Sequence, residues 1–250
     1  MVNNKLYVVG GFSDGNFRTG VWCYNFYSMQ WEPCAALNEI KGYFAVATLH
    51  NCIYVICGSD SSRQRCTSFD CYDIIKNTWK SLPSLSSGKS DAAAVAYKNR
   101  IWITGGFDGT RTLSRVEAFD PLTETWTDMP PMDEQRSAHC TVVFDNKIYA
   151  IGGFQHGRST ETVEYYDGLK WKPAPPMHIP RSNFDAVVAD GCIYVMGGHG
   201  NAGEHSMGNC EKFDGKSWTP IHCLPKPIAA GVAEFIEKPS HIAQLLCRRS

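Results

Sequence analysis

The chain has 250 residues, of which 43% are hydrophobic and 20% are charged, so it is long enough to bury a substantial core. Its 24 Lys and Arg side chains against 25 Asp and Glu give a formal net charge of -1, so nucleic acid could bind only at a local basic patch, which the sequence does not display. No apolar run is long enough to span a bilayer and no apolar signal core follows Met1, so we expect neither a nucleic-acid nor a membrane partner.

Five segments repeat along the chain, and in each an alternating, strand-like run ends in a glycine pair. They are KLYVVGG (5–11), CIYVICG (52–58), RIWITGG (100–106), KIYAIGG (147–153) and CIYVMGG (192–198). The second repeat has Cys57 in place of the first glycine, and the repeat glycines are Gly10, Gly11, Gly58, Gly105, Gly106, Gly152, Gly153, Gly197 and Gly198.

An aromatic residue and then a tryptophan follow each glycine pair. The aromatic residues are Tyr24, Tyr72, Phe119, Tyr166 and Phe213, and the tryptophans are Trp31, Trp79, Trp126, Trp171 and Trp218. The tryptophans are 48, 47, 45 and 47 residues apart, a period that is typical of a repeat architecture such as a propeller.

Each period contains four strand-length runs separated by turn residues. In the third period they are residues 91–98, 100–106, 114–119 and 125–129. This pattern predicts a meander of four antiparallel strands, and one such sheet cannot cover both of its own faces. Neighbouring sheets must therefore stack, and closing them into a ring leaves only short, protected edges.

The two ends of the chain differ from the internal repeats. The first repeat lacks the apolar run that precedes the glycine-pair strand in the other four, whereas such a run recurs at residues 228–237 with no glycine pair after it. We expect this C-terminal strand to complete the first blade and so to close the ring.

The segment at 105–153, GGFDGTRTLSRVEAFDPLTETWTDMPPMDEQRSAHCTVVFDNKIYAIGG, resembles a repeat of the Kelch-like adaptor proteins, in which BTB and BACK domains precede the Kelch repeats. The resemblance covers residues 1–238 and implies an all-β Kelch propeller. Five four-stranded blades are visible, whereas that family usually has six, so a five-bladed ring and a fragment of a six-bladed one are both open. Residues 239–250 lie outside the resemblance and are expected to form a disordered tail.

The repeated residues have a structural interpretation. The glycines precede strands rather than helices, which indicates backbone geometry and not phosphate binding. The tryptophans and their aromatic partners fit the wide interface between blades, where each ring is buried.

A partner is expected on the loops that follow the glycine pairs, since loops on a rigid scaffold usually carry binding groups. In the family that the chain resembles, two positions per blade line the substrate pocket. The residue after the glycine pair is here Phe12, Ser59, Phe107, Phe154 or His199. The second position is the residue after an arginine that leads into the first strand of a blade. It is Ser137 after Arg136 and Ser182 after Arg181, and Ser90 takes this position after Lys89, where lysine replaces arginine. Gly42 after Lys41 and Pro227 after Lys226 match poorly.

Nearby loop cations complete this predicted rim, namely Arg18, Arg63, Arg65, Arg111 and Arg158. Phenylalanines, hydroxyls and guanidinium groups together suit an acidic peptide with an apolar anchor. The resemblance implies recognition of a target protein for a cullin-type ubiquitin ligase, with the cullin reached through a BTB domain that this sequence does not contain. The alternative is a cytoskeletal protein that binds actin.

An enzyme is the third class considered, because some proteins with Kelch repeats are copper oxidases or sugar isomerases. The eight histidines show no HxH or HExxH spacing, so we predict no catalytic residue, no metal and no cofactor. The eleven cysteines include no CxxC pair and several lie in apolar runs, which indicates buried thiols in a reducing compartment. We expect a cytoplasmic protein, with the cytoskeleton and the nucleus as alternatives.

Overall fold

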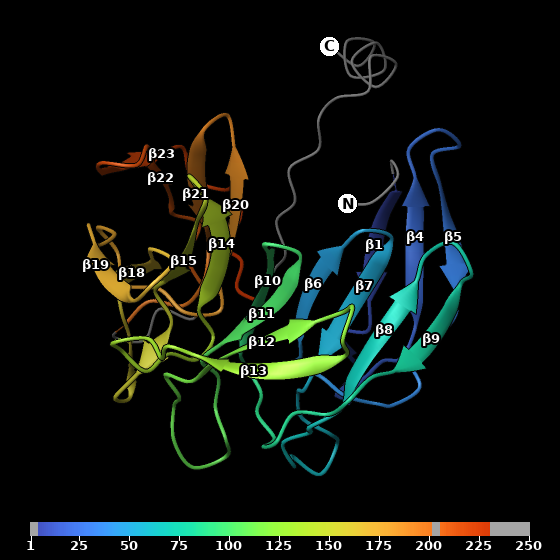
Figure 1. Cartoon of the computed structure of the whole chain (residues 1–250). Coiled ribbons are helices and arrows are strands. Elements are labelled where there is room, and N and C mark those ends of the chain that lie inside the picture. Colours follow the sequence, from blue (N-terminus) through green and yellow to red (C-terminus); the bar gives the residue numbers. More distant parts are fainter. Residues whose placement is uncertain (1–4, 202–205, 231–250) are drawn as a thin grey trace.

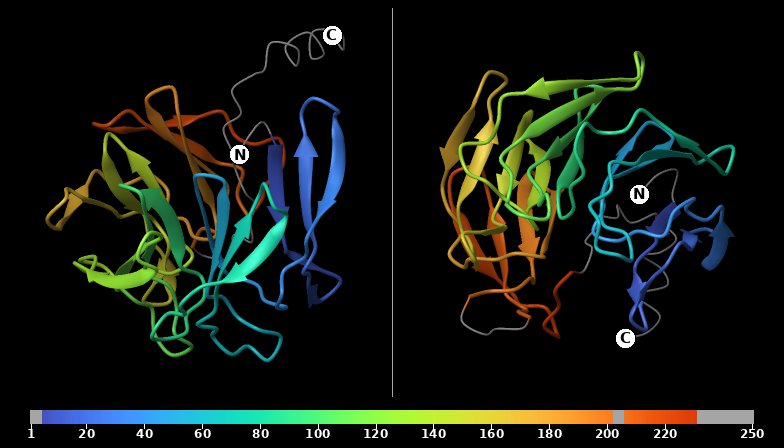
Figure 2. Two further views of the ribbon diagram at one scale, coloured as in Figure 1. Left: turned by 45° about the vertical axis from the view of Figure 1, so that its right-hand side comes forward. Right: turned by 90° about the horizontal axis from the view of Figure 1, so that it is seen from below.

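The computed structural model describes residues 5–201 and 206–230, which form 23 β-strands and no helix. The main strands gather into five antiparallel sheets arranged around a central space (Figures 1 and 2). The predicted all-β propeller of five blades is thereby confirmed. Since these residues contain no helix, none of them forms an apolar helix that could cross a bilayer.

The second to fifth blades are four-stranded meanders whose first strand is the innermost. The second blade consists of β6 (Ala45–Leu49), β7 (Cys52–Ile56), β8 (Phe69–Asp73) and β9 (Thr78–Ser81). The third consists of β10 (Ala93–Tyr97), β11 (Arg100–Thr104), β12 (Val116–Asp120) and β13 (Thr125–Met129). The fourth consists of β14 (Cys140–Phe144), β15 (Lys147–Ile151), β18 (Val163–Tyr166) and β19 (Trp171–Ala174). The fifth consists of β20 (Asp185–Ala189), β21 (Cys192–Met196), β22 (Cys210–Phe213) and β23 (Trp218–Ile221).

The first blade has three strands among the described residues. They are β1 (Lys5–Val9), β4 (Val21–Asn25) and β5 (Gln30–Cys34), and they correspond to the second, third and fourth strands of the other blades. The first blade therefore starts one strand short, as its sequence indicates. Of the segment expected to close it, residues 231–237 lie outside the described residues, as does the predicted tail at 239–250.

Two small hairpins project from the loops after the glycine pairs. The first blade carries β2 (Phe12–Ser13) and β3 (Asn16–Phe17), and the fourth carries β16 (Phe154–Gln155) and β17 (Arg158–Ser159). The loops in which a partner is expected are thus built as short turns stiffened by backbone pairing.

The core consists of four apolar clusters, one at each junction between successive blades. Between the second and third blades, for example, Ile56 of β7 and Phe119 of β12 are fully buried together. Four of the repeat tryptophans also bridge blades, because each indole N–H donates to a backbone carbonyl of the preceding blade. These bonds join Trp79 to Ala35, Trp126 to Pro83, Trp171 to Pro130 and Trp218 to Pro175, at 2.8–2.9 Å.

The glycine pair packs against the lead-in segments of two blades. A Cβ atom on Gly152 would lie 2.8 Å from the carbonyl oxygen of Arg181, which leads into the next blade, whereas Gly153 faces the lead-in segment of its own blade. A Cβ atom on Gly153 would lie 2.8 Å from the carbonyl oxygen of Ser137 and 2.7 Å from the Cβ of His139, and the φ angle of Gly153 is +105°. Such a φ is sterically costly for any residue with a side chain. Cys57 can replace the first glycine of its pair because that position has φ of 54°, in the left-handed region that other residues tolerate at some cost.

A basic side chain is buried where the chain leads into each complete blade, and each pairs with a carboxylate on the third strand of that blade. The pairs are Lys41 with Asp70, Lys89 with Glu117, Arg136 with Glu164 and Arg181 with Glu211, at 2.6–2.9 Å. Arg181 also donates to the carbonyl oxygens of Gly197 and Asn209. The side chain thus ties the lead-in segment to the glycine pair of its own blade.

Removing one carboxylate tests how much the stability of the fold depends on these ion pairs. Arg181 and Glu211 are fully buried, so Glu211→Gln leaves the buried guanidinium group of Arg181 without its counter-charge. We expect the free energy of unfolding in urea to fall by about 3–5 kcal/mol. Asp128→Asn, which removes an exposed partner of Arg115, should cost less than about 1 kcal/mol. Equal losses in the two variants would contradict this assignment.

Candidate functional site

The two positions predicted to line a pocket are brought together in pairs on the loop face, the face formed by the loops after the glycine pairs. In each pair the two residues exchange both backbone N–H···O bonds, at 2.7–3.1 Å. The pairs are Gly42 with Ser59, Ser90 with Phe107, Ser137 with Phe154 and Ser182 with His199. Each of the second to fifth blades therefore presents one residue from its own loop next to one from its lead-in segment.

The serines of these pairs are buried, and their hydroxyl groups are engaged within the protein. Ser90 Oγ donates to Asp91 Oδ2 at 2.6 Å, and Ser182 Oγ shares a bond with Ser159 Oγ at 2.9 Å. Ser137 Oγ donates to the Phe154 carbonyl, and Ser59 Oγ accepts from Arg65. These hydroxyls hold the face in shape, which corrects the expectation that they lie open on a rim.

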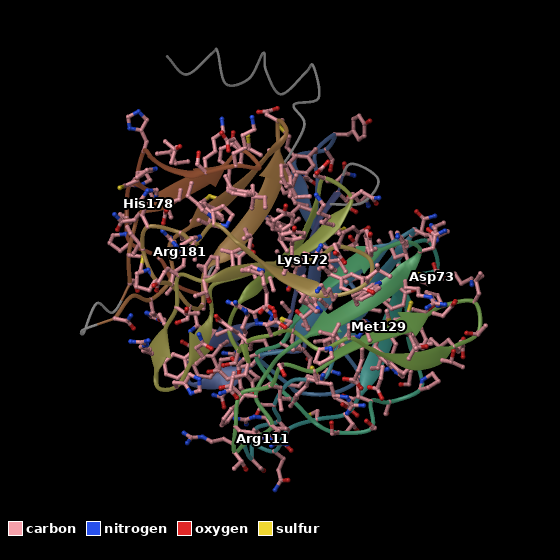
Figure 3. The ribbon with its side chains drawn as sticks, turned by 60° about the vertical axis from the view of Figure 1, so that its left-hand side comes forward. Asp73, Arg111, Met129, Lys172, His178 and Arg181 are labelled. Carbon is pink, nitrogen blue, oxygen red and sulfur yellow. The ribbon has the colours of Figure 1, made fainter. Side chains whose placement is uncertain are left out.

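Arg136 and Arg181 do not lie on the predicted rim either, because their guanidinium groups are buried in the ion pairs described above. Arg136 donates to Glu164, to Glu134 and to the carbonyl oxygens of Gly152 and Thr162. Figure 3 shows Arg181 among the strands and Arg111 at the outer edge of the molecule. A partner cannot reach the two buried side chains in this structure, so we keep the binding prediction for the exposed residues alone.

The exposed part of the predicted set consists of Phe12, Phe154, Arg18, Arg63, Arg111 and Arg158. Phe107 and His199 are half-buried, and the Phe107 ring lies under the guanidinium of Arg65, whose Cζ is 5.2 Å from the ring centroid. Arg65 is held there by its bond to Ser59, so the second and third blades share a fixed cation over an aromatic ring.

An aromatic cluster at the junction of the first and second blades was only partly predicted. The rings of Phe12 and Phe17 have centroids 5.5 Å apart, and those of Phe17 and Tyr43 are 5.6 Å apart. Phe12 is 64% exposed and Tyr43 is 59% exposed. Gly42 makes this cluster possible, because a Cβ there would lie 2.2 Å from the Phe17 ring. The glycine after Lys41, which departs from the family pattern, is the signal that could have revealed it.

A chain of backbone hydrogen bonds runs across the mouth of the central space. The five participating residues all have φ between 50° and 55°, and they are Tyr43, Asp91, Ala138, Asn183 and Ala230. The N–H of each of the last four donates to the carbonyl of the residue before it in this series, at 2.7–2.9 Å. Ala230 takes the same place as Asn183, so the lead-in residues equivalent to Arg181 and Ser182 are Ile228 and Ala229 rather than Lys226 and Pro227.

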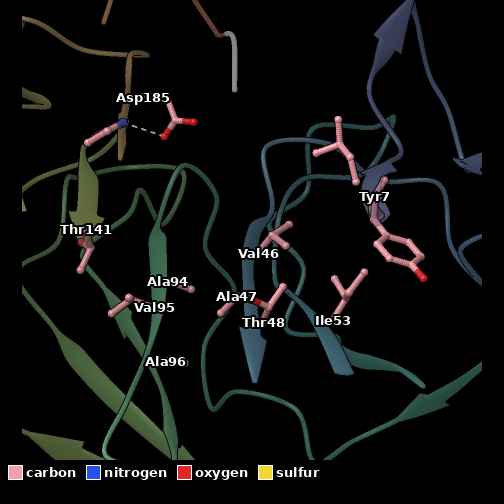
Figure 4. Close-up of a pocket in the computed structure, with 13 residues that line it drawn as sticks. Tyr7, Val46, Ala47, Thr48, Ile53, Ala94, Val95, Ala96, Thr141 and Asp185 are labelled. Atoms are coloured by element: carbon pink, nitrogen blue, oxygen red, sulfur yellow. Dashed lines mark hydrogen bonds between the residues drawn. The ribbon is translucent and has the colours of Figure 1, made fainter. Parts of the chain in front are cut away.

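The central space contains a pocket of about 500 Å³ with largely apolar walls (Figure 4). Together the inner strands β6 and β10 and the strand β1 contribute most of the wall, and β1 lines it where the first blade has no described inner strand. Asp185 is the one carboxylate among the lining residues. The described residues include no group of three His, Cys, Asp or Glu side chains placed to hold a metal ion.

His139 lies beside the mouth of this space and is buried. Its Nε2 is 2.8 Å from Thr104 Oγ1, whereas Nδ1 has no hydrogen-bond partner among residues 5–201 and 206–230. Burial, with a smaller contribution from the charge of Arg136, lowers the pKa of His139 to about 3. This imidazole is therefore neutral in the folded protein at physiological pH.

Comparison with known protein families gives two matches. The KLHDC2/KLHL20/DRC7 Kelch-repeats domain matches residues 1–153, and the Kelch motif matches residues 135–178 and 180–224.

Several curated proteins are similar over part of the chain. Spermatocyte protein spe-26 of Caenorhabditis elegans is 29% identical over 126 residues, covering 48% of this chain and 22% of that protein. Alpha-scruin of Limulus polyphemus is 30% identical over 113 residues, covering 42% and 12%. Kelch-like protein 36 of Bos taurus is 27% identical over 114 residues, covering 43% and 18%. The matched part of this chain thus spans less than a quarter of each relative.

One solved structure, described as the structure of YjhT, superimposes with a TM-score of 0.80 and 16% identity. The superposition covers 93% of this chain and 84% of YjhT. At this level of identity the likeness concerns the fold.

The burial of His139 predicts a pH dependence of stability. Its pKa is about 3 when folded and about 6.5 when unfolded, so below pH 6.5 the unfolded chain binds the extra proton and stability is lost as the pH falls. Between pH 7 and pH 5 this group should remove about 2 kcal/mol from the free energy of unfolding. His139→Gln should show a correspondingly shallower decline in urea unfolding over that range. Parallel declines in the two proteins would rule out this role.

Proposed function

Because the chain belongs to the Kelch-repeat domain family, whose domain matches residues 1–153, we propose that its loop face recognises a segment of a target protein. Propellers of this family are protein-interaction modules. The observation that carries the proposal is the exposed aromatic cluster of Phe12, Phe17 and Tyr43 on a face whose backbone is otherwise fixed.

The aromatic cluster has the properties of an interface anchor. Two of its rings lie largely in water, a position that costs free energy unless a partner covers them. Aromatic side chains dominate the energy of protein interfaces, and rings that are held by edge contacts lose little conformational entropy on binding. A hydrophobic side chain of the target would pack here, at the junction of the first and second blades.

Cations on the same face favour an acidic target segment. Arg111 is 77% exposed on its loop, and Arg158 and Arg63 are exposed as well. Guanidinium groups bind carboxylates with two parallel hydrogen bonds, which fixes orientation as well as charge. Since Arg111 has Asp108 3.4 Å away, a target carboxylate would have to replace that weak internal contact.

We propose further that the recognised protein is a substrate for a cullin-type ubiquitin ligase. The support is the resemblance to the Kelch-like adaptors together with similarity to Kelch-like protein 36, and this chain spans less than a quarter of that relative. In this role the propeller holds the target, and a BTB domain would engage the cullin. Binding to filamentous actin is the second candidate, since actin-binding Kelch proteins share the same repeat.

A phage-displayed library of random peptides tests recognition by the loop face. The loop-face variant changes four exposed residues to alanine, namely Phe12, Phe154, Arg111 and Arg158. A matched control changes two apolar and two basic residues on the turns between the third and fourth strands of the blades, namely Leu122, Leu169, Lys76 and Lys216.

The wild-type protein and the control should enrich peptides with an aromatic or aliphatic residue near carboxylates, and the loop-face variant should lose at least about tenfold in affinity for them. Loss of binding in the control alone, or unchanged binding in the loop-face variant, would place the interface elsewhere.

Two further measurements separate the adaptor role from the cytoskeletal one. Co-sedimentation with filamentous actin should give no saturable binding, and saturable binding that the loop-face variant loses would support actin instead. Induced expression of the wild-type chain in cells should change the abundance of a small set of proteins by quantitative mass spectrometry, because the chain occupies their degradation signal. The same set must stay unchanged with the loop-face variant for the adaptor role to hold.

A further inference from the structure

A second pocket lies at the mouth of the central space, apart from the one between the inner strands. Its volume is about 170 Å³, and the lead-in segments of the second to fifth blades build its wall together with Ala230. Among the described residues that line it, Asp91 is the only charged one, since the imidazole of His139 is neutral. The pocket thus presents a single carboxylate on a face whose exposed predicted residues are aromatic or basic.

The carboxylate of Asp91 is half-buried and lacks a basic partner. Its Oδ2 accepts from the hydroxyl of Ser90 at 2.6 Å, and within residues 5–201 and 206–230 no lysine or arginine forms an ion pair with it. Burial raises the pKa of Asp91, and the Ser90 hydroxyl and the charge of Arg65 offset only part of this effect. A carboxylate withdrawn from water without a counter-charge is costly. Asp91 therefore differs from the carboxylates that pair with the lead-in cations.

Two further polar groups in the same wall have no hydrogen-bond partner in the part of the chain that the structure describes. They are the side-chain amide of Asn183 and the buried Nδ1 of His139. In the tautomer whose Nε2–H donates to Thr104, His139 Nδ1 is an acceptor. A ligand with several N–H donors would find a carboxylate, an amide oxygen and this nitrogen as acceptors in one pocket.

Tyr43 connects this pocket with the aromatic cluster of Phe12, Phe17 and Tyr43. Its ring centroid lies 5.6 Å from that of Phe17, and Tyr43 also lines the pocket, as does the neighbouring Phe44. The faces of such rings attract a cation. Since Tyr43 belongs to both places, a hydrophobic side chain on the cluster and a charged one in the pocket would come from residues close together in one target segment.

We propose that the mouth pocket binds one lysine or arginine side chain of the target, with Asp91 as its counter-charge. This inference rests on the proposed recognition of a target segment by the loop face. The pocket has room for one long side chain, its single charge is negative, and its unpaired polar groups offer acceptors to N–H donors. A target carboxylate is disfavoured at this point, because Asp91 would repel it. The recognised segment is thus acidic except for one basic residue beside its hydrophobic anchor.

Asp91→Asn removes the charge and keeps the local structure. Asn183 has φ of 51° at the equivalent position of the fifth blade, so asparagine suits the φ of 55° at Asp91, and its amide oxygen still accepts from Ser90. Peptides that the wild-type chain selects from the phage-displayed library should carry a lysine or arginine within about three residues of the hydrophobic one. Their affinity for Asp91→Asn should be at least about tenfold lower.

The matched control is Asp14→Asn, which removes an exposed carboxylate from the loop face outside the mouth and should leave the affinity unchanged. Replacing the basic residue of the peptide by glutamine should weaken binding to the wild type and have little effect on binding to Asp91→Asn. Selected peptides without a basic residue, or equal losses in the two variants, would refute the proposal. The thermal midpoint of Asp91→Asn should be unchanged or higher, and a fall of about 3 °C or more would assign Asp91 to the support of the fold instead.

A small probe separates this inference from the proposed function, because it requires no peptide. In the ¹⁵N-labelled full chain, n-butylguanidinium should shift the amide signals of Asp91, Ala138 and Asn183 saturably, and the neutral n-butylurea should bind at least about tenfold more weakly. Absent binding, or equal binding of the two probes, would overturn the cation site whatever the peptides show. Saturable binding of n-butylguanidinium without selection of any peptide would mean that the pocket serves a small cation, which would overturn both the assignment to a target side chain and the proposed function.

Discussion

The buried ion pair at the start of each complete blade is the interaction on which the rest of this propeller depends. The cation belongs to the segment that enters a blade, and its side chain reaches the carboxylate of that blade. Arg136 and Arg181 also donate to a carbonyl of the glycine pair of their own blade. The carbonyls of Lys89, Arg136 and Arg181 accept from a glycine-pair N–H of the blade before. One residue thus fixes the position of two neighbouring sheets. Because both charges are withdrawn from water, the geometry tolerates little displacement, and the apolar faces are held in register beside it.

The loop face follows from this constraint. The residue after each buried cation is placed by it, and its backbone is paired with the residue after the glycine pair, as in Ser137 with Phe154. With the backbone satisfied and the serines turned inward, the predicted side chains that remain exposed are aromatic or basic. Four blades support these loops with the same backbone pairing, so their specificity depends on the side chains that each loop presents.

Much of the fold could be predicted from the sequence because it repeats. The glycine pairs and tryptophans gave the number of blades, and the four runs at 91–129 match the positions of β10 to β13. The site was harder to predict, since the pattern R-S identifies a position in the chain but not the direction of its side chain. Arg136 resembles a surface residue in sequence, and only the carboxylate of Glu164 on a distant strand shows that it is buried. Likewise, the contact of Phe17 with Gly42 joins two blades, which a local pattern cannot reveal.

The chain of backbone bonds from Tyr43 to Ala230 connects successive lead-in segments around the axis of the molecule. Each bond joins two neighbouring blades, so separating those blades would break it as well as the apolar contact between them. A ligand bound at this mouth would contact the lead-in segments of several blades at once, because Tyr43, Asp91, Ala138, Asn183 and Ala230 line one pocket there. Binding there would therefore stabilise contacts between several blades together, although each blade is a separate sheet.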